Sequence, residues 1–261
     1  MTIPEPTLTI IAMAWNEADH LGPCFKSLEP LIQLTGADTL VLLNDNSDKP
    51  TVEAAHRVAG RVASTRFENF SNQRNRALAL ASTRWVFFID PDERCTPALA
   101  VEIANAIAQD QCAAFRVSRR NFLFGKEIRH TGWWPDYQTR LFEREGTYYD
   151  EQRQVHEYPV VSGETCILLN PLIHFNYETW GQFVRKQRSY APLEAQALYN
   201  AGTRARLQSF IGQPLREFKR RYIDYEGYRD GLTGLALSIA MSLYRAETYR
   251  QLRRIQRSSP E

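Results

Sequence analysis

The sequence predicts an α/β fold with a mostly parallel sheet and helices on both of its faces. Short apolar runs alternate with helical patterns up to about residue 110, and this strand–helix order is typical of a parallel, doubly wound sheet. Three of the predicted strands end in clusters of Asp, Asn or Glu. Because open α/β sheets bind their ligands at the carboxyl ends of strands, this edge of the sheet is the expected functional edge.

The central strand is predicted at residues 85–89, which form a continuous apolar run rich in aromatic residues. Such a run is typical of a strand that is buried on both faces. It ends at Asp90-Pro91-Asp92-Glu93, where the proline cannot donate to a central ladder. Asp90 and Asp92 can both face one crevice and offer oxygen ligands to Mg²⁺ or Mn²⁺. The alternative is an acidic turn that only leads into the next helix.

The other elements follow from the same kinds of pattern. The first part of the chain is predicted to hold strands at 7–14, 39–43 and 62–66 and helices at 18–34, 52–59, 71–81 and 97–109. Ser71 and Thr96 are the expected N-caps of the last two helices. Beyond them, strands are predicted at 113–117, 138–143 and 155–158, and the chain is helical from 180 to 257. Trp133, Trp134 and Tyr137 suit either a sugar-stacking surface or a core.

The charge distribution separates an acidic first part from a basic end. Of the 261 residues, 43% are hydrophobic and 24% are charged, which is ordinary for a soluble globular protein. Residues 180–261 hold 15 Lys and Arg against 7 Asp and Glu, a balance of +8 in a chain of net charge +2. The last predicted helix, at 235–255, is amphipathic and ends in arginines. It suits either an anionic membrane surface or packing on the domain with a solvated end.

The cysteines and the apolar segments indicate a cytoplasmic protein. The four cysteines lie far apart and lack zinc-site spacing, so free thiols in a reducing compartment are expected. The sequence shows no signal-peptide pattern and no run of the ~20 apolar residues that a transmembrane helix requires. The basic end allows peripheral attachment to the inner face of the plasma membrane as well.

Four short motifs resemble those of family 2 glycosyltransferases and occur in the same order as in that family. They are Ala14-Trp15-Asn16-Glu17, Leu42-Leu43-Asn44-Asp45-Asn46-Ser47-Asp48, Gln73-Arg74-Asn75 and Phe88-Ile89-Asp90-Pro91-Asp92-Glu93. The resemblance implies the GT-A fold, in which a Rossmann-like nucleotide-binding half is fused to an acceptor-binding half. It places the nucleotide-sugar-binding half at 1–110, the acceptor-binding half at 111–179 and a basic helical region at 180–261.

Three later motifs are similar to a bacterial branch of the family that adds sugars to the inner core of lipopolysaccharide. They are Tyr137-Gln138-Thr139-Arg140-Leu141-Phe142, Val155-His156-Glu157 and Leu172-Ile173-His174-Phe175. Two departures from the wider family matter. Asn44 stands where many members have an aspartate, so one base or ribose contact is expected to differ. The Gln-x-x-Arg-Trp motif and transmembrane helices of processive synthases are absent, which implies a single addition.

The resemblance implies an inverting, metal-dependent glycosyltransferase that moves a sugar from a nucleotide sugar, UDP-linked, to a glycan or glycolipid acceptor. A divalent metal, Mg²⁺ or Mn²⁺, would bind Asp92 and offset charge on the leaving diphosphate. No nucleic-acid partner is expected. The nucleotide-binding residues would be Ala14, Asn16, Glu17, Asp45, Ser47, Arg74 and Asp90.

The catalytic base that accepts the proton of the acceptor hydroxyl has two candidates. Glu157 is preferred because it lies at the end of a short predicted strand in the second half, beside His156, and Asp136 is the alternative. His156 and His174 suit contacts to the metal or the diphosphate, or ordinary structural hydrogen bonds.

Two other functions fit parts of the pattern. A sugar-phosphate nucleotidyltransferase would require a glycine-rich phosphate loop after the first strand, but Trp15-Asn16-Glu17 has no glycine. A non-catalytic module that binds a nucleotide sugar or a membrane surface would need Asp45 and Asp90 but neither Asp92 nor Glu157. NAD binding is disfavoured because no G-x-G-x-x-G follows any predicted strand.

Overall fold

The computed structural model describes residues 7–151 and 158–258, which form two compact units. The first unit comprises Met1–Arg119 and Tyr137–His174, and the second comprises Arg120–Asp136 and Phe175–Glu261. The division of the chain into a nucleotide-binding half, an acceptor-binding half and a basic region stays a prediction.

The first unit contains most of the sheet and the helices that cover it. Its elements are β1 (Leu8–Ala14), α1 (Ala18–Thr35), β2 (Asp38–Asn44), α2 (Lys49–Val58), β3 (Arg61–Thr65), α3 (Phe70–Leu80), β4 (Trp85–Ile89), β5 (Glu93–Arg94), α4 (Pro97–Gln109), β9 (Tyr148–Tyr149) and β10 (Pro159–Val160). Three strands cross the boundary between the units: β6 (Ala114–Leu123), β8 (Asp136–Glu143) and β11 (Thr165–Tyr177).

The main sheet is parallel at one end and mixed at the other. Its strand order is β3-β2-β1-β4-β8-β6-β11-β5. The strands β3, β2, β1 and β4 pair in parallel, whereas β8 is antiparallel to β4 and β5 is antiparallel to β11. The carboxyl ends of β1, β2 and β4 therefore meet at one edge, as the sequence predicts.

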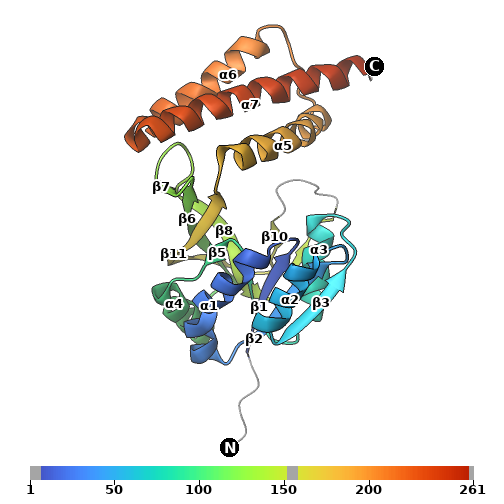
Figure 1. Cartoon of the computed structure of the whole chain (residues 1–261), viewed down its shortest axis with the longest axis vertical. Coiled ribbons are helices and arrows are strands. Elements are labelled where there is room, and N and C mark those ends of the chain that lie inside the picture. Colours follow the sequence, from blue (N-terminus) through green and yellow to red (C-terminus); the bar gives the residue numbers. More distant parts are fainter. Residues whose placement is uncertain (1–6, 152–157, 259–261) are drawn as a thin grey trace, which may run out of the picture. The chain divides into compact units, whose positions relative to one another are not determined.

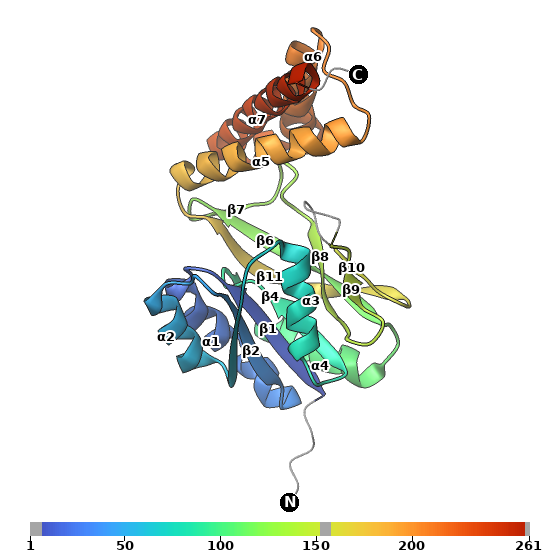
Figure 2. The same cartoon turned by 90° about the vertical axis from the view of Figure 1, so that its right-hand side faces the viewer.

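Alternating side chains of the parallel strands build two separate core layers, one on each face of the sheet. Leu8, Ile10 and Ala12 of β1 pack with the buried faces of α1, α2 and α4. Ile11, between them in sequence, packs on the other face with Ala77 of α3. Figures 1 and 2 show α1 and α3 on opposite sides of β1. This two-sided burial explains why the strands read as continuous apolar runs.

Several predicted elements are confirmed, and two helices begin earlier than expected. The central strand at 85–89 and the helix at 97–109 are confirmed with their predicted bounds, and Thr96 caps that helix. Helix α2 begins at Lys49 because the Asp48 side chain accepts a hydrogen bond from the Thr51 amide. Helix α3 is capped by Asn69, so the prediction of Ser71 as its N-cap is wrong.

Strand β11 has no counterpart among the predicted elements, and β6 is longer than expected. The 13 residues of β11 contain Asn170 and Pro171, which interrupt the apolar alternation that marks a strand. Strand β6 continues to Leu123 rather than ending at Val117. The strand predicted at 155–158 falls largely outside the described residues, and β10 follows it.

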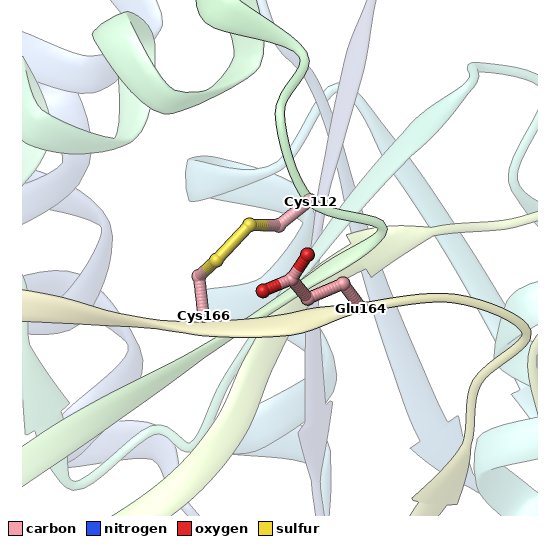
Figure 3. A group of neighbouring side chains, drawn as sticks. All are labelled: Cys112, Glu164 and Cys166. Atoms are coloured by element: carbon pink, nitrogen blue, oxygen red, sulfur yellow. A yellow bond between two sulfur atoms is a disulfide. The ribbon is translucent and has the colours of Figure 1, made fainter.

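The expectation of four free thiols is wrong for two of them. Cys112 and Cys166 form a disulfide with a Cα–Cα distance of 6.1 Å, although 54 residues separate them. The pairing depends on the return of the chain along β11, which the sequence did not reveal. Figure 3 shows Glu164 beside this pair. Cys24 and Cys95 are free and buried, and burial raises the pKa of both thiols, so they are unreactive.

The second unit is mainly helical, as predicted. It contains β7 (Lys126–Ile128), α5 (Trp180–Asn200), α6 (Ser209–Lys219), the π-helical turn η1 (Arg220–Asp224), the 3₁₀ turn η2 (Gly227–Asp230) and α7 (Gly231–Ser258). Apolar side chains of α5 and α7 pack together. A Cβ on Gly234 of α7 would lie 1.9 Å from the Gly227 carbonyl oxygen, so glycine permits this close approach. Among the described residues, no helix has the length and apolar character needed to span a bilayer.

Candidate active site

The acidic turn after β4 lies at the carboxyl edge of the sheet. The Glu93 amide donates to the Asp90 carbonyl oxygen at 2.9 Å, which closes the turn. The Glu93 carboxylate accepts a hydrogen bond from the Asp90 amide at 3.0 Å and is fully buried. Asp90 and Asp92 remain partly accessible, with 30% and 28% of their side chains exposed. The turn therefore uses Glu93 internally and presents the two aspartates to solvent.

Arg140 of β8 joins two of these carboxylates from the neighbouring strand. Its Nη2 donates to Asp90 and, at 2.5 Å, to Glu93, while only 4% of its side chain is exposed. Arg119 of β6 adds a contact to Glu93 at 3.3 Å. Burial raises the pKa of Asp90, but the positive charges of Arg140 and Arg74 outweigh this, and its pKa lies well below the usual range. Asp90 is thus held as a carboxylate.

Arg74 of α3 also contacts Asp90 and is not a solvated helix residue. Its Nη2 lies 3.7 Å from Asp90 Oδ1, and 11% of its side chain is exposed. Its guanidinium lies 5.2 Å from the ring centroid of Phe88 and 5.6 Å from that of Tyr149. These contacts orient a positive charge at the acidic turn, where a diphosphate would need it.

Asp92 is paired with His174 of β11. The distance from His174 Nε2 to Asp92 Oδ2 is 3.3 Å, and the histidine side chain is 7% exposed. Strand β11 pairs with β5 in a register that places His174 opposite Glu93. A carboxylate and an imidazole at this separation are two ligand types that divalent cations accept.

The ends of β1 and β2 supply further polar groups to the same edge. Asn16 has a positive φ of 56°, and its Oδ1 accepts a hydrogen bond from the Asp48 amide at 2.9 Å. Asp45 is exposed, and its amide donates to the Thr65 carbonyl. The Ser47 hydroxyl is buried and has no hydrogen-bond partner among the described residues. Polar groups that are free to meet a ligand therefore follow β2.

The other predicted nucleotide contacts at this edge have structural surroundings of their own. Ala14 is buried at the end of β1. Glu17 precedes α1, and its carboxylate lies 4.0 Å from His20. Asn44 is buried and accepts a hydrogen bond from Gln73 of α3. Asn44, where many family members have an aspartate, therefore connects β2 to α3 through a hydrogen bond between two side-chain amides.

One of the two predicted bases, Asp136, lies among the described residues. Glu157 and His156 lie outside the described residues. Asp136 belongs to the second unit, where its carboxylate accepts a hydrogen bond from Asn121 at 3.3 Å. Trp133 packs into the apolar core of that unit, whereas Trp134 is 40% exposed.

Arg140, Glu93 and Arg119 are the site residues that sequence reasoning did not assign. Each comes from a different strand, and β8, β5 and β6 are brought together only by non-local pairing. One feature of the sequence does point to Arg140: it is a charged residue beside the apolar Leu141 and Phe142 in a predicted strand. A buried charge of this kind requires a partner, and the acidic turn was the obvious one.

The profile of glycosyl transferase family 2 matches residues 9–166, which is more than half of the chain and includes every motif up to Cys166. The chain belongs to this family, and the predicted resemblance is confirmed.

Two known proteins are similar to this chain over most of its length. The chain is 27% identical over 249 residues to the lipopolysaccharide core biosynthesis glycosyltransferase LpsC of Rhizobium meliloti (strain 1021), covering 93% of this chain and 90% of that protein. The structure of residues 1–349 of S. aureus TarS, in complex with UDP-GlcNAc, superposes with a TM-score of 0.50 at 13% identity. The match covers 97% of this chain and 91% of that 1–349 fragment of TarS. The superposition confirms the predicted GT-A-like fold.

Proposed function

We propose that the protein transfers one hexose from a UDP-linked sugar to a glycan of the lipopolysaccharide core, with inversion at the anomeric carbon. The observation that carries this proposal is the acidic turn at Asp90 and Asp92, set between polar groups at the ends of β1 and β2 and arginines of α3 and β8. The UDP-GlcNAc complex of TarS and the core-biosynthesis role named for LpsC support the donor and the acceptor.

The residues around the turn suit the separate demands of the reaction. The groups after β1 and β2 (Asn16, Asp45 and Ser47) can read the N–H and O–H groups of uracil and ribose. Arg74, held beside Asp90, can offset diphosphate charge. The acceptor hydroxyl would attack the anomeric carbon as its proton moves to a carboxylate, Glu157 or Asp136, and the C–O bond to the diphosphate breaks on the opposite face. Attack from that side produces the inversion.

The donor set at Asp92 and His174 fits a divalent cation. Cations of this kind commonly take one or two protein ligands and complete their coordination with substrate phosphates and water. Such a cation would supply Lewis-acid stabilisation of the departing diphosphate. Among the described residues, the group of three potential ligands at Cys112, Glu164 and Cys166 is not a competing site, because the disulfide removes both thiolates.

Thermal unfolding in the presence of nucleotides tests the donor assignment. We expect UDP to raise the melting temperature and Mn²⁺ to increase the effect, because a ligand at 100 times its Kd stabilises the native state by about 2.7 kcal/mol. GDP, CMP and NAD at the same concentration serve as controls. Stabilisation by one of these without any effect of UDP would contradict the assignment.

We further propose that the second unit attaches the enzyme to anionic lipid at the cytoplasmic face of the membrane. Leu207, just before α6, and Ile211 and Leu215 within it follow one another at four-residue intervals and are 77%, 70% and 62% exposed. The nearby Arg206 and Arg216 have no carboxylate partner among the described residues. An exposed apolar stripe flanked by arginines suits the negative surface of the cytoplasmic leaflet.

Vesicle sedimentation tests this attachment. Binding to vesicles that contain an anionic lipid is expected to fall as salt is added, since the attraction is screened. The double substitution Ile211→Gln and Leu215→Gln should weaken binding by roughly tenfold or more, because two large apolar side chains no longer enter the lipid. Leu169→Gln, at an 84% exposed leucine of β11, is the matched control. Absent or salt-insensitive binding would contradict the proposal.

A further inference from the structure

A cavity of about 300 Å³ opens in the first unit beside the acidic turn. It is lined by side chains of α3, β6, β8, β9 and the segment that leads into β10. Prominent among them are three arginines and three tyrosines: Arg74, Arg116, Arg140, Tyr137, Tyr149 and Tyr158. Among the residues that the structure describes, no Asp or Glu lines the cavity. Its chemistry is therefore cationic and aromatic.

Arg116 differs from the other two arginines of this cavity in its surroundings among the described residues. Arg140 is bound by Asp90 and Glu93, and Arg74 lies 3.7 Å from Asp90. Arg116 is exposed and has no ion pair within the described part of the chain. Its guanidinium lies 5.2 Å from the centroid of the Tyr137 ring. A planar guanidinium against a ring keeps its N–H groups available for a bidentate contact to a phosphate or carboxylate.

The sheet order separates most of this cavity from the groups expected to bind uracil and ribose, although Arg74, expected at the diphosphate, also lines it. Asn16, Asp45 and Ser47 follow β1 and β2, on one side of β4, whereas the cavity is formed on β8 and β6, on the other side. A donor that extends from β2 to the acidic turn places its sugar at Asp90 and Asp92. The cavity lies beyond that point, on the side from which a second substrate would approach.

We propose that the cavity binds an anionic substituent, a phosphate or a carboxylate, on the sugar that accepts the transferred hexose. Arg116 contacts the anion, and Tyr137 offers a ring face to the C–H groups of the acceptor sugar. This inference rests on the proposed function, because it takes the acidic turn as the reaction centre. It assigns the acceptor to the class of charged sugars.

Ligand-detected NMR on protein saturated with UDP and Mn²⁺ tests the inference. Saturation with UDP is verified first, and failure at that step would contradict the proposed function rather than this inference. Glucose 6-phosphate, glucuronate, glucose and inorganic phosphate are then titrated separately. We expect at least one charged sugar to bind roughly tenfold or more tightly than glucose and more tightly than inorganic phosphate. The better of the two charged sugars identifies the anion.

The substitution Arg116→Gln is a second test of the inference. It should remove most of the preference for the charged sugar and leave UDP affinity unchanged, while Arg116→Lys retains part of the preference because the charge remains. Arg57→Gln, at an exposed arginine of α2, is the matched control. Equal binding of glucose and the charged sugars, or no effect of Arg116→Gln, would overturn the inference. Weaker UDP binding by Arg116→Gln would assign the cavity to the donor diphosphate and overturn it as well.

Discussion

Replacing Asp92 by Asn is expected to lower the rate of sugar transfer by roughly 10²–10³-fold, the usual cost of losing one group that stabilises developing charge. The Asp92 carboxylate is 28% exposed, and His174 lies 3.3 Å from it. The substitution keeps the shape of the side chain and removes its charge. Stopped-assay measurement of transfer, with UDP affinity measured with and without Mn²⁺, checks the result. The metal-dependent part of UDP binding should weaken together with the rate.

Asp110→Asn is the matched control for this substitution. Asp110 ends α4 and pairs with Arg84 in an exposed contact, and exposed ion pairs contribute only about 0–1 kcal/mol to stability. Transfer by this variant should equal that of the parent enzyme. An Asp92→Asn enzyme as active as the parent would exclude the proposed metal-assisted reaction.

Replacing Glu157 by Gln is expected to lower transfer by roughly 10²–10⁴-fold, the usual contribution of a general base. Because the side chain is proposed to act on the acceptor and not on the donor, UDP affinity in the presence of metal should be unchanged. The measurement is again a comparison of transfer rate with UDP affinity, so that loss of folding or of donor binding is recognised.

Asp136→Asn is the companion to this experiment. If Glu157 is the base, Asp136→Asn should retain near-normal transfer, since the role of Asp136 is then structural, as in its hydrogen bond from Asn121. A Glu157→Gln enzyme with near-normal transfer, together with a collapsed Asp136→Asn enzyme, would move the assignment to Asp136.

The elements that could be predicted from sequence are those with local signals. Strand β4 is a five-residue apolar run that ends before a proline, and α4 has a threonine cap followed by Pro97. Helix α2 begins three residues before its predicted start at 52, because Asp48 caps it and Pro50 lies in its first turn. Strand β11 was not predicted, because its pairing with β5 places His174 opposite Glu93, which lies far away in the sequence.

The same distinction applies to the site. Asp90 and Asp92 could be predicted because they follow a recognisable strand at the functional edge. Their contacts with Arg140, Arg74 and His174 could not, since these side chains come from β8, α3 and β11. Sequence spacing carries no information on contacts made across a mixed sheet. The pairing of Cys112 with Cys166 was missed for this reason too.

The most direct test of the central claim is an assay of hexose transfer. The protein would be incubated with Mn²⁺, a lipopolysaccharide core oligosaccharide and each of several UDP-hexoses, and the products followed by mass spectrometry. We expect one UDP-hexose to give an acceptor heavier by a single hexose, with one UDP released per addition. An acceptor of unchanged mass with every UDP-hexose, together with formation of a nucleotide sugar in a parallel incubation with UTP and a sugar phosphate, would contradict the account.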